Sequence, residues 1–186
     1  MIGFAMTGSF CSIPTSLFLL KKLAEKGYEI VPIMSDTLYK TDTRFGTAED
    51  IRKSVKDITD KEIIHTIVGA EPLGPKSKLE ALVICPCTGN TLAKIANGIT
   101  DTAVCMAAKA HLRNDKPLII ALASNDALSA NLQNIAKLLS RKNVYFVPMT
   151  QDDPQKKPHS LVFDSSYLFE TIEHAEKGIQ VPKIFI

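Results

Sequence analysis

Three neighbouring residues, Thr7, Gly8 and Ser9, follow the apolar run MIGFAM at the start of this 186-residue chain. The two hydroxyls can donate to phosphate oxygens, and the glycine lets the backbone approach a ligand closely. Ser12 and Pro14 then begin a helical pattern, with Ser12 as a plausible N-cap. The free N–H groups and the dipole of a helix start favour anions. The stretch therefore predicts either a phosphate site or an ordinary strand-to-helix turn, and by itself it leaves both open.

The spacing of the glycines excludes two common phosphate motifs. Gly3 and Gly8 do not form the G-x-G-x-x-G fingerprint of dinucleotide-binding domains. The nearest approach to a P-loop lies in residues 69–77, where Pro75 separates the glycine from the lysine and removes a donor N–H. We interpret that segment as a loop. One glycine with two hydroxyls suits a single terminal phosphate, as in FMN.

A second strand–turn–helix unit has the same character. The apolar run at residues 79–85 is typical of a strand buried on both faces. After it come four polar or small residues and then a helical face at residues 92–99; the four are Thr88, Gly89, Asn90 and Thr91. Residues 124–126 (SND) follow a third apolar run. Because ligands bind beyond the carboxyl ends of parallel strands, we expect these turns to face one site.

Two other polar residues, Ser35 and Arg44, are candidate ligand contacts. Each could equally well serve only to stabilise the local structure. Ser35 follows the expected strand at residues 29–34, where it can either contact the same ligand as Ser9 or cap a helix or turn. Arg44, in the polar loop TDTRFG, can clamp a substrate carboxylate bidentately. It can as readily pair with Asp42 or Asp50.

The elements that must position these residues alternate along the chain. The sequence predicts strands followed by helices throughout, which is typical of a three-layer α/β/α, Rossmann-like (flavodoxin-like) domain with a parallel sheet of about six strands. We expect one domain, residues 1–186. The expected strands are 1–6, 29–34, 62–68, 79–85, 118–123 and 144–147. The expected helices are 14–27, 49–57, 92–99, 104–112, about 129–140 (with Leu132, Ile135, Ala136 and Leu139 inward) and 167–177.

Composition narrows the class of protein. The chain is 45% hydrophobic and 23% charged with a net charge of +2, which indicates neither disorder nor a basic nucleic-acid stripe. We expect a cytoplasmic protein with no membrane partner, since there is no signal-peptide n-region or membrane-length apolar run. The four cysteines form no C-x-x-C pair, so we expect buried free thiols and no metal site. None of the four histidines stands beside a nucleophile, and none is given a catalytic role.

Two further segments suggest contacts with other chains or ligands. Residues 151–160 (QDDPQKKPHS) form a proline- and charge-rich loop, and such a loop is usually functional or covers an interface. The alanine-rich helix at residues 102–110 has a small face that allows close approach of a neighbouring protomer.

The Thr7–Gly8–Ser9 turn together with residues 86–101 (PCTGNTLAKIANGITD) resembles the flavoprotein superfamily of cysteine-peptide decarboxylases, phosphopantothenoylcysteine decarboxylases and flavin prenyltransferases. The resemblance covers nearly the whole chain. Within the superfamily, the family of dipicolinate synthase B subunits is more similar. The stretches that carry this likeness are TDTRFG (41–46), AEPLGPK (70–76), MAAKA (106–110), SNDAL (124–128), YFVP (145–148) and the 151–160 loop.

The resemblance implies FMN as cofactor and oligomers of trimeric or dodecameric order. It also implies an A subunit with an NAD(P)-type Rossmann domain as partner and a place in the mother cell of a spore-forming bacterium. The pair would oxidise dihydrodipicolinate to pyridine-2,6-dicarboxylate. By resemblance, Thr7, Gly8, Ser9 and Ser35 hold the FMN phosphate and ribityl end, and Thr88, Gly89, Asn90 and Thr91 lie near the flavin. Asn125 lies near its reactive side, and Arg44 holds a substrate carboxylate.

The sequence departs from the two better known chemistries of the superfamily. The decarboxylase motif P-x-M-N-x-x-M is replaced by LASNDAL at residues 122–128, where only Asn125 matches the polar position. The early histidine of the decarboxylases has no counterpart near residues 12–20, and the Arg-Glu pair of the prenyltransferases is replaced by Ser124-Asn125. An FMN-dependent decarboxylase of a cysteine derivative is the alternative enzyme, and a non-catalytic scaffold for the A subunit is the alternative outside enzymology.

Overall fold

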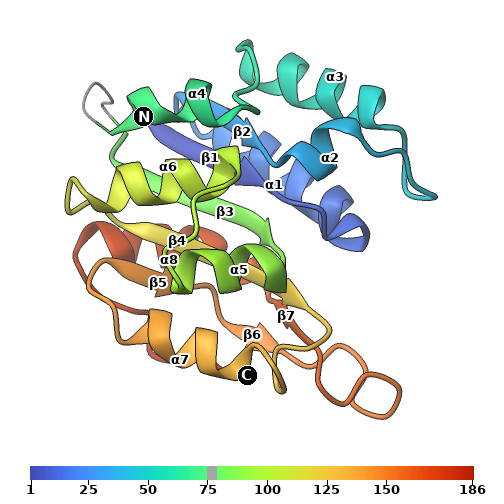
Figure 1. Ribbon diagram of the computed structural model, residues 1–186, viewed down its shortest axis with the longest axis vertical. Coiled ribbons are helices and arrows are strands. Elements are labelled where there is room, and N and C mark those ends of the chain that lie inside the picture. Colours follow the sequence, from blue (N-terminus) through green and yellow to red (C-terminus); the bar gives the residue numbers. More distant parts are fainter. Residues whose placement is uncertain (75–78) are drawn as a thin grey trace.

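The computed structural model describes residues 1–74 and 79–186. Its centre is a parallel sheet with strands in the order β2 (Ile30–Met34), β1 (Ile2–Met6), β3 (Ala81–Cys87), β4 (Leu118–Ser124) and β5 (Val144–Phe146) (Figure 1). Every residue of β1, β3 and β4 is buried, which explains their continuous apolar runs. The chain runs from β1 to β2 in one direction and then returns to β3 on the other side of β1, so the strand order reverses between β1 and β3. Such a reversal opens a crevice at the carboxyl ends of the strands.

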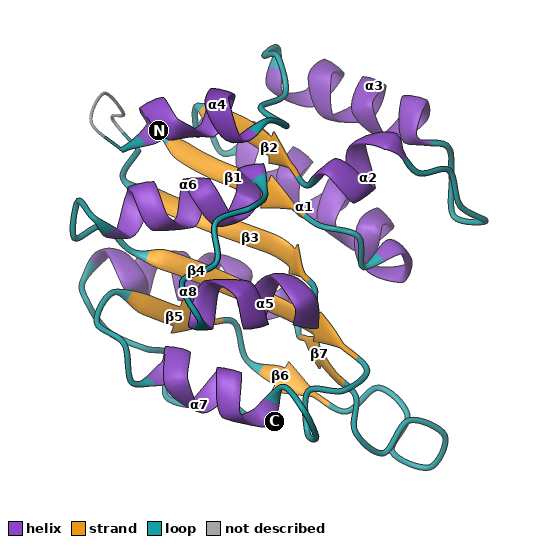
Figure 2. Cartoon of the chain, viewed as in Figure 1, coloured by secondary structure: helices purple, strands orange, loops and turns teal. Residues whose placement is uncertain are grey.

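Helices cover both faces of this sheet (Figure 2). One face carries α1 (Ile13–Glu25), α2 (Asp36–Lys40), α3 (Ala48–Thr59) and α8 (Leu168–Glu176), whose buried side chains share a core with Phe4 and Met6. The other face carries α4 (Ile67–Ala70), α5 (Gly89–Ala96), α6 (Ala103–Leu112) and α7 (Leu132–Leu139), packed on a core that includes Ala5. Alternate residues of β1 thus serve opposite cores, and the expected three-layer fold is confirmed.

The sheet continues beyond β4 as a short antiparallel extension. Strand β7 (Leu161–Phe163) pairs with the end of β4, and β6 (Met149–Thr150) pairs with β7, so the sheet has seven strands. About six strands, all parallel, were expected from the sequence, and these two were missed. Strands of two and three residues on either side of a proline-rich loop show no measurable period.

One expected strand is wrong. Residues 62–68 form a single bridge, Ile33 to Ile64, and then Thr66 starts α4 by accepting a hydrogen bond from Gly69 N at 3.0 Å. Ile64 donates to Pro32 O at 3.0 Å and accepts from Met34 N at 2.8 Å, and the threonine cap then ends the extended chain before a second bridge forms. The loop expected at residues 69–77 is instead the end of α4 and a 3-10 turn (Glu71–Leu73), and residues 75–77 lie outside the described residues.

The inward face of α7 was also misjudged. Its buried residues are Asn134, Ile135 and Leu138, whereas Leu132 is 45% exposed. The helix is oriented so that Asn134 joins a network of polar side chains at the end of β4. The hydrophobic pattern of the sequence alone does not predict this orientation. Of the cysteines, three are buried as expected, and Cys11 is exposed.

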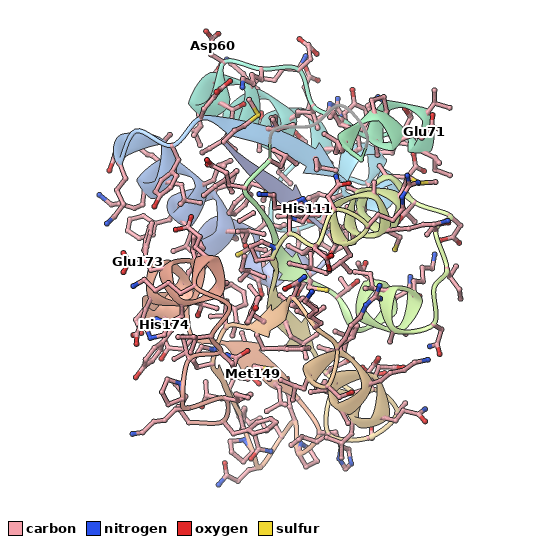
Figure 3. All side chains as sticks on the ribbon, turned by 90° about the vertical axis from the view of Figure 1, so that its left-hand side faces the viewer. Asp60, Glu71, His111, Met149, Glu173 and His174 are labelled. Atoms are coloured by element: carbon pink, nitrogen blue, oxygen red, sulfur yellow. The ribbon has the colours of Figure 1, made fainter. Side chains whose placement is uncertain are left out.

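His111 of α6 is buried with Nε2 3.0 Å from Pro117 O (Figure 3), and burial lowers its pKa to about 4, so the ring is neutral. Across residues 1–74 and 79–186, none of the helices combines the length and apolarity needed to cross a bilayer.

Candidate functional site

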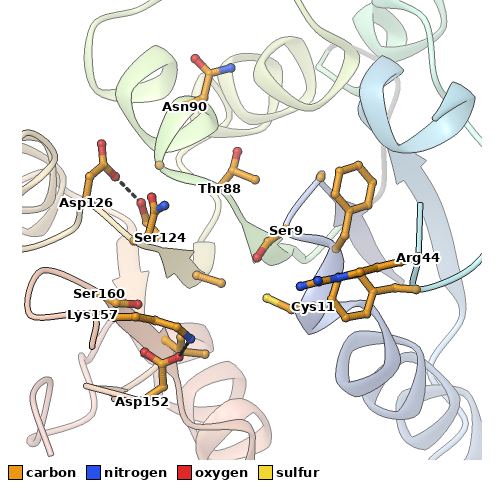
Figure 4. Close-up of a pocket in the computed structure, with 17 residues that line it drawn as sticks. Ser9, Cys11, Arg44, Thr88, Asn90, Ser124, Asp126, Asp152, Lys157 and Ser160 are labelled. Atoms are coloured by element: carbon orange, nitrogen blue, oxygen red, sulfur yellow. Dashed lines mark hydrogen bonds and ion pairs between the residues drawn. The ribbon is translucent and has the colours of Figure 1, made fainter. Parts of the chain in front are cut away.

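A cavity of about 540 Å³ lies at the carboxyl ends of β1, β3 and β4, at the point where the strand order reverses. Its walls come from five segments: the turns after β1 and β3, the end of β4, the loop before α3 and the loop between β6 and β7 (Figure 4). Seven of the predicted site residues line it: Gly8, Ser9, Arg44, Thr88, Gly89, Asn90 and Asn125. The other three, Thr7, Ser35 and Thr91, are not part of the lining.

Thr7 ties the first two turns together. Its Oγ1 donates to Pro86 O at 2.7 Å and accepts from Thr88 N at 2.9 Å. The side chain is buried, so these bonds are made away from solvent, where losing them is costly. Thr7 therefore fixes the distance between the ends of β1 and β3.

Beyond Thr7, side-chain hydrogen bonds stabilise the turn after β1 only weakly. A 3-10 turn (Phe10–Ser12) separates it from α1, and Ser12 takes the N-cap position of α1 without a side-chain capping bond. Within the described part of the chain, the hydroxyl of Ser9 meets only Ser12 Oγ, at 3.4 Å. The hydroxyl of Ser9 therefore faces the cavity, and one long hydrogen bond is all that engages it among the described residues.

The turn after β3 is a capped helix start. Thr88 Oγ1 accepts from Thr91 N at 3.2 Å and donates to Thr91 Oγ1 at 3.0 Å. No described residue accepts a hydrogen bond from the backbone N–H of Gly89 or Asn90, which stand at the cavity wall. These two N–H groups and the helix dipole form an anion-binding position.

A polar network joins the end of β4 to the start of α7, and the start of α5 packs against it. Asp126 accepts from Ser124 Oγ at 2.5 Å and from Asn131 Nδ2 at 3.0 Å, and Asn131 Oδ1 accepts from Asn134 Nδ2 at 2.9 Å. The hydrogen bond from Ser124 holds the pKa of Asp126 below its usual value. A Cβ at Gly89 would stand 2.6 Å from Asn131 Nδ2 and 2.8 Å from Asp126 Oδ1. Only glycine fits where the helix start meets this network.

The loop before α3 contributes Arg44 and Phe45. The guanidinium of Arg44 lies 4.9 Å from the centre of the Phe45 ring. Its expected acidic partners are engaged elsewhere: Asp42 accepts from Ala48 N at 2.8 Å, and Asp50 accepts from Thr47 Oγ1 at 2.7 Å. Among the described residues, Arg44 forms no ion pair, so its charge is available to the cavity.

Ser35 and Thr91 have structural roles of their own. Ser35 caps α2 by accepting from Leu38 N at 3.3 Å, and Thr91 is buried under the Thr88 cap. Neither role tests the proposed part of these residues in cofactor binding, which stays a prediction.

The loop between β6 and β7 supplies residues that were not predicted to belong to the site. Lys157 Nζ lies 2.5 Å from Asp152 Oδ2, and both side chains line the cavity with Ser160. The ion pair lowers the pKa of Asp152 and raises that of Lys157. Phe10 and Cys11 also line the cavity and were not predicted to do so. Ser124 and Asp126 belong to the turn at residues 124–126, which was expected to face the site, although neither was given a role of its own. Nothing local distinguishes Lys157 from Lys156.

These walls suit a molecule that joins a flat apolar ring to an anion. Ala123, Val162 and Phe10 are apolar parts of the lining, and Ser9 with the N–H groups of α5 supplies donors. The backbone N–H groups of Gly89 and Asn90 stand at the cavity wall without an acceptor among the described residues. The residues present therefore fit FMN.

Comparison with known proteins agrees with this geometry. The sequence profile of the Flavoprotein family matches residues 1–167. The B subunit of dipicolinate synthase from Bacillus subtilis (strain 168) is 43% identical over 185 residues, covering 100% of this chain and 92% of that protein. The crystal structure of the dipicolinate synthase B subunit from Bacillus halodurans is 44% identical with a TM-score of 0.91, covering 100% of this chain and 95% of that one.

A more distant neighbour shows the fold alone. It is SpaF, an FMN-dependent cysteine decarboxylase, at 19% identity and a TM-score of 0.70, with 95% of this chain and 94% of that chain covered. The profile match and the full-length similarity to the B subunits establish the relationship. This chain belongs to the Flavoprotein family, and the B subunit of dipicolinate synthase is among its full-length relatives.

Proposed function

We propose that this chain is the B subunit of a dipicolinate synthase and that it helps oxidise dihydrodipicolinate to pyridine-2,6-dicarboxylate during spore formation. The full-length similarity to B subunits at 43% identity carries the proposal. The cavity supports it, because Arg44, which forms no ion pair with a described residue, adds a cation to a site with the donors that a flavin phosphate needs. The A subunit, with a nicotinamide-binding domain, is the partner, and the mother-cell cytoplasm is the place of action.

The reaction removes a proton and a hydride equivalent from the substrate, and formation of the aromatic ring drives it. Bound FMN would supply a hydride acceptor, and the nicotinamide of the A subunit is the alternative acceptor. In the proposal, the group that holds the FMN phosphate and ribityl end consists of Thr7, Gly8, Ser9 and Ser35. Thr88, Gly89, Asn90 and Thr91 form the wall beside the flavin.

Two side chains of the lining are assigned to the substrate. Asn125 is exposed at the cavity, where its amide can orient the dihydropyridine against the flavin. Arg44 binds one carboxylate, since its planar guanidinium matches a carboxylate in two parallel hydrogen bonds. The proposal also includes assembly of several copies of this chain, as the resemblance implies.

The test is reconstitution of the chain with the A subunit, followed by the absorbance of pyridine-2,6-dicarboxylate. We expect Asn125→Ala to reduce turnover at least tenfold while the complex with the A subunit stays intact. Gln133→Ala is the matched control, because that exposed amide of α7 donates to Ala130 O and lies outside the cavity lining. Arg44→Ala should raise the KM for substrate.

Different outcomes point to different functions. Unchanged turnover in Asn125→Ala, with an intact complex, contradicts catalysis at this cavity and favours a scaffold that orders the A subunit. Release of carbon dioxide from a cysteine derivative such as a phosphopantothenoylcysteine-like compound supports the decarboxylase instead. An unchanged KM in Arg44→Ala removes that residue from the substrate site.

A further inference from the structure

Four charged side chains line the described part of the cavity: Arg44, Asp126, Asp152 and Lys157. The two acids are already engaged inside the protein. Asp126 accepts hydrogen bonds from Ser124 and Asn131, and Asp152 pairs with Lys157. The groups left to face a ligand are therefore mainly cationic.

The two cations belong to different walls. Arg44 comes from the loop before α3, and Lys157 comes from the loop between β6 and β7. Figure 4 shows them entering from opposite sides, with Ser9 and Cys11 between them. A ligand that contacts both needs an anionic group at each end.

Lys157 is held in position by its own loop. Its N–H donates to Asp153 O at 2.7 Å, and its carbonyl accepts from Ser160 N at 3.1 Å. The loop is fastened to the segment after β4, where Leu128 N donates to His159 O at 2.9 Å. The ammonium uses one of its three donors on Asp152, so two remain for a ligand.

Asp152 shapes what Lys157 can bind. Its carboxylate is 2.5 Å from the ammonium and cancels much of the charge that a distant anion would meet. A single carboxylate gains little from such a neutralised pair. A ligand already anchored by its other carboxylate on Arg44 is brought to the lysine at high effective concentration.

From these positions we infer that the cavity recognises a dicarboxylate by both ends: Arg44 binds one carboxylate, and Lys157, held by Asp152, binds the other. This rests on the proposed function and adds the residue that binds the second carboxylate of the substrate at the same site. Lys157 is then the residue that distinguishes a dicarboxylate from a monocarboxylate.

The experiment uses the FMN-loaded chain and two probes, pyridine-2,6-dicarboxylate and pyridine-2-carboxylate, titrated by calorimetry. We expect the dicarboxylate to bind at least about tenfold more tightly. Lys157→Gln should weaken dicarboxylate binding about tenfold and leave monocarboxylate binding unchanged. Asp152→Asn should strengthen dicarboxylate binding several-fold, because it releases the charge of Lys157.

Lys156→Gln is the matched control. Lys156 belongs to the same loop, its side chain is 86% exposed, and it lies outside the cavity lining. We expect both probes to bind this variant as they bind the unmodified chain. A lysine that merely fastens the loop would give a different pattern, in which Lys157→Gln and Asp152→Asn weaken both probes alike.

The turnover and titration measurements together distinguish failure of the inference from failure of the proposed function. Suppose that the chain supports turnover with the A subunit, but that Lys157→Gln binds both probes as Lys156→Gln does. The inference is then overturned and the proposed function stands. If the unmodified chain binds neither probe and gives no turnover with the A subunit, both are overturned. The inference is also overturned if Lys157→Gln weakens the binding of the dicarboxylate and of the monocarboxylate equally.

Discussion

The turns after β1 and β3 look alike in sequence, but their structures differ. Both place a threonine, a glycine and a further polar residue after a buried strand. After β3, Thr88 caps α5 and Gly89 packs on the Asp126 network. After β1, a 3-10 turn intervenes and the hydroxyl of Ser9 makes one contact of 3.4 Å with the described residues.

The difference separates two tasks. The turn after β3 is fixed by bonds within the protein, and its threonine hydroxyl is used in the helix cap, so it offers a ligand its backbone N–H groups and the side chain of Asn90. The turn after β1 keeps a side-chain hydroxyl available. We therefore expect changes after β3 to alter stability and binding together, and a change at Ser9 to alter binding alone.

The largest effect should come from Gly89→Ala. The new methyl group would collide with Asn131 and Asp126, and overpacking of this kind costs about 1–3 kcal/mol. We expect a lower melting temperature and at least tenfold weaker FMN binding. Gly8→Ala is the control from the other turn, since its Cβ would meet Thr37 and Phe10 at ordinary distances of 3.4 and 3.5 Å. Equal destabilisation by the two changes would contradict the contrast between the turns.

Thr7→Val should come next, because it removes the hydroxyl that joins the two turns. The substitution leaves Thr88 N without its acceptor, which costs about 1–3 kcal/mol, whereas Pro86 O keeps the hydrogen bond from Thr7 N. Chemical denaturation measures the loss. Thr171→Val, which removes one hydrogen bond within α8, should cost less, and a smaller loss at Thr7 would contradict its linking role.

Thr88→Ala tests whether the turn after β3 affects FMN binding apart from its effect on stability. Loss of a helix N-cap costs about 1 kcal/mol. Thr102→Ala removes the equivalent cap of α6, where Cys105 N donates to Thr102 Oγ1 at 3.2 Å, away from the cavity lining. We expect similar free energies of unfolding for the two variants, with weaker FMN binding only in Thr88→Ala. Weaker binding in both would mean that global stability, rather than the turn, controls the affinity.

Local sequence predicted the parts of this molecule that local chemistry determines. The buried strands around Phe4, Val83 and Ile120 and the polar turns that follow them were visible as apolar runs with abrupt ends. The meeting of Ser9 and Asn90 at one cavity was anticipated from the rule that ligands bind at the carboxyl ends of parallel strands.

What the sequence did not reveal depends on contacts between distant segments. Lys157 reaches the cavity because β7 pairs with the end of β4, and a three-residue strand carries too little pattern to predict that pairing. Asn134 turns inward because its amide donates to Asn131 Oδ1, against the hydrophobic pattern of α7. The cofactor assignments of Thr7, Ser35 and Thr91 stay predictions.

The central claim is that the turn after β1 binds the phosphate of FMN. The most direct measurement is titration of the purified chain with FMN by fluorescence quenching, with riboflavin as the ligand lacking phosphate. We predict saturable FMN binding that riboflavin does not match and that Ser9→Ala weakens at least tenfold with no change in melting temperature. Equal binding of FMN and riboflavin, or FMN binding that Ser9→Ala leaves unchanged, would contradict it.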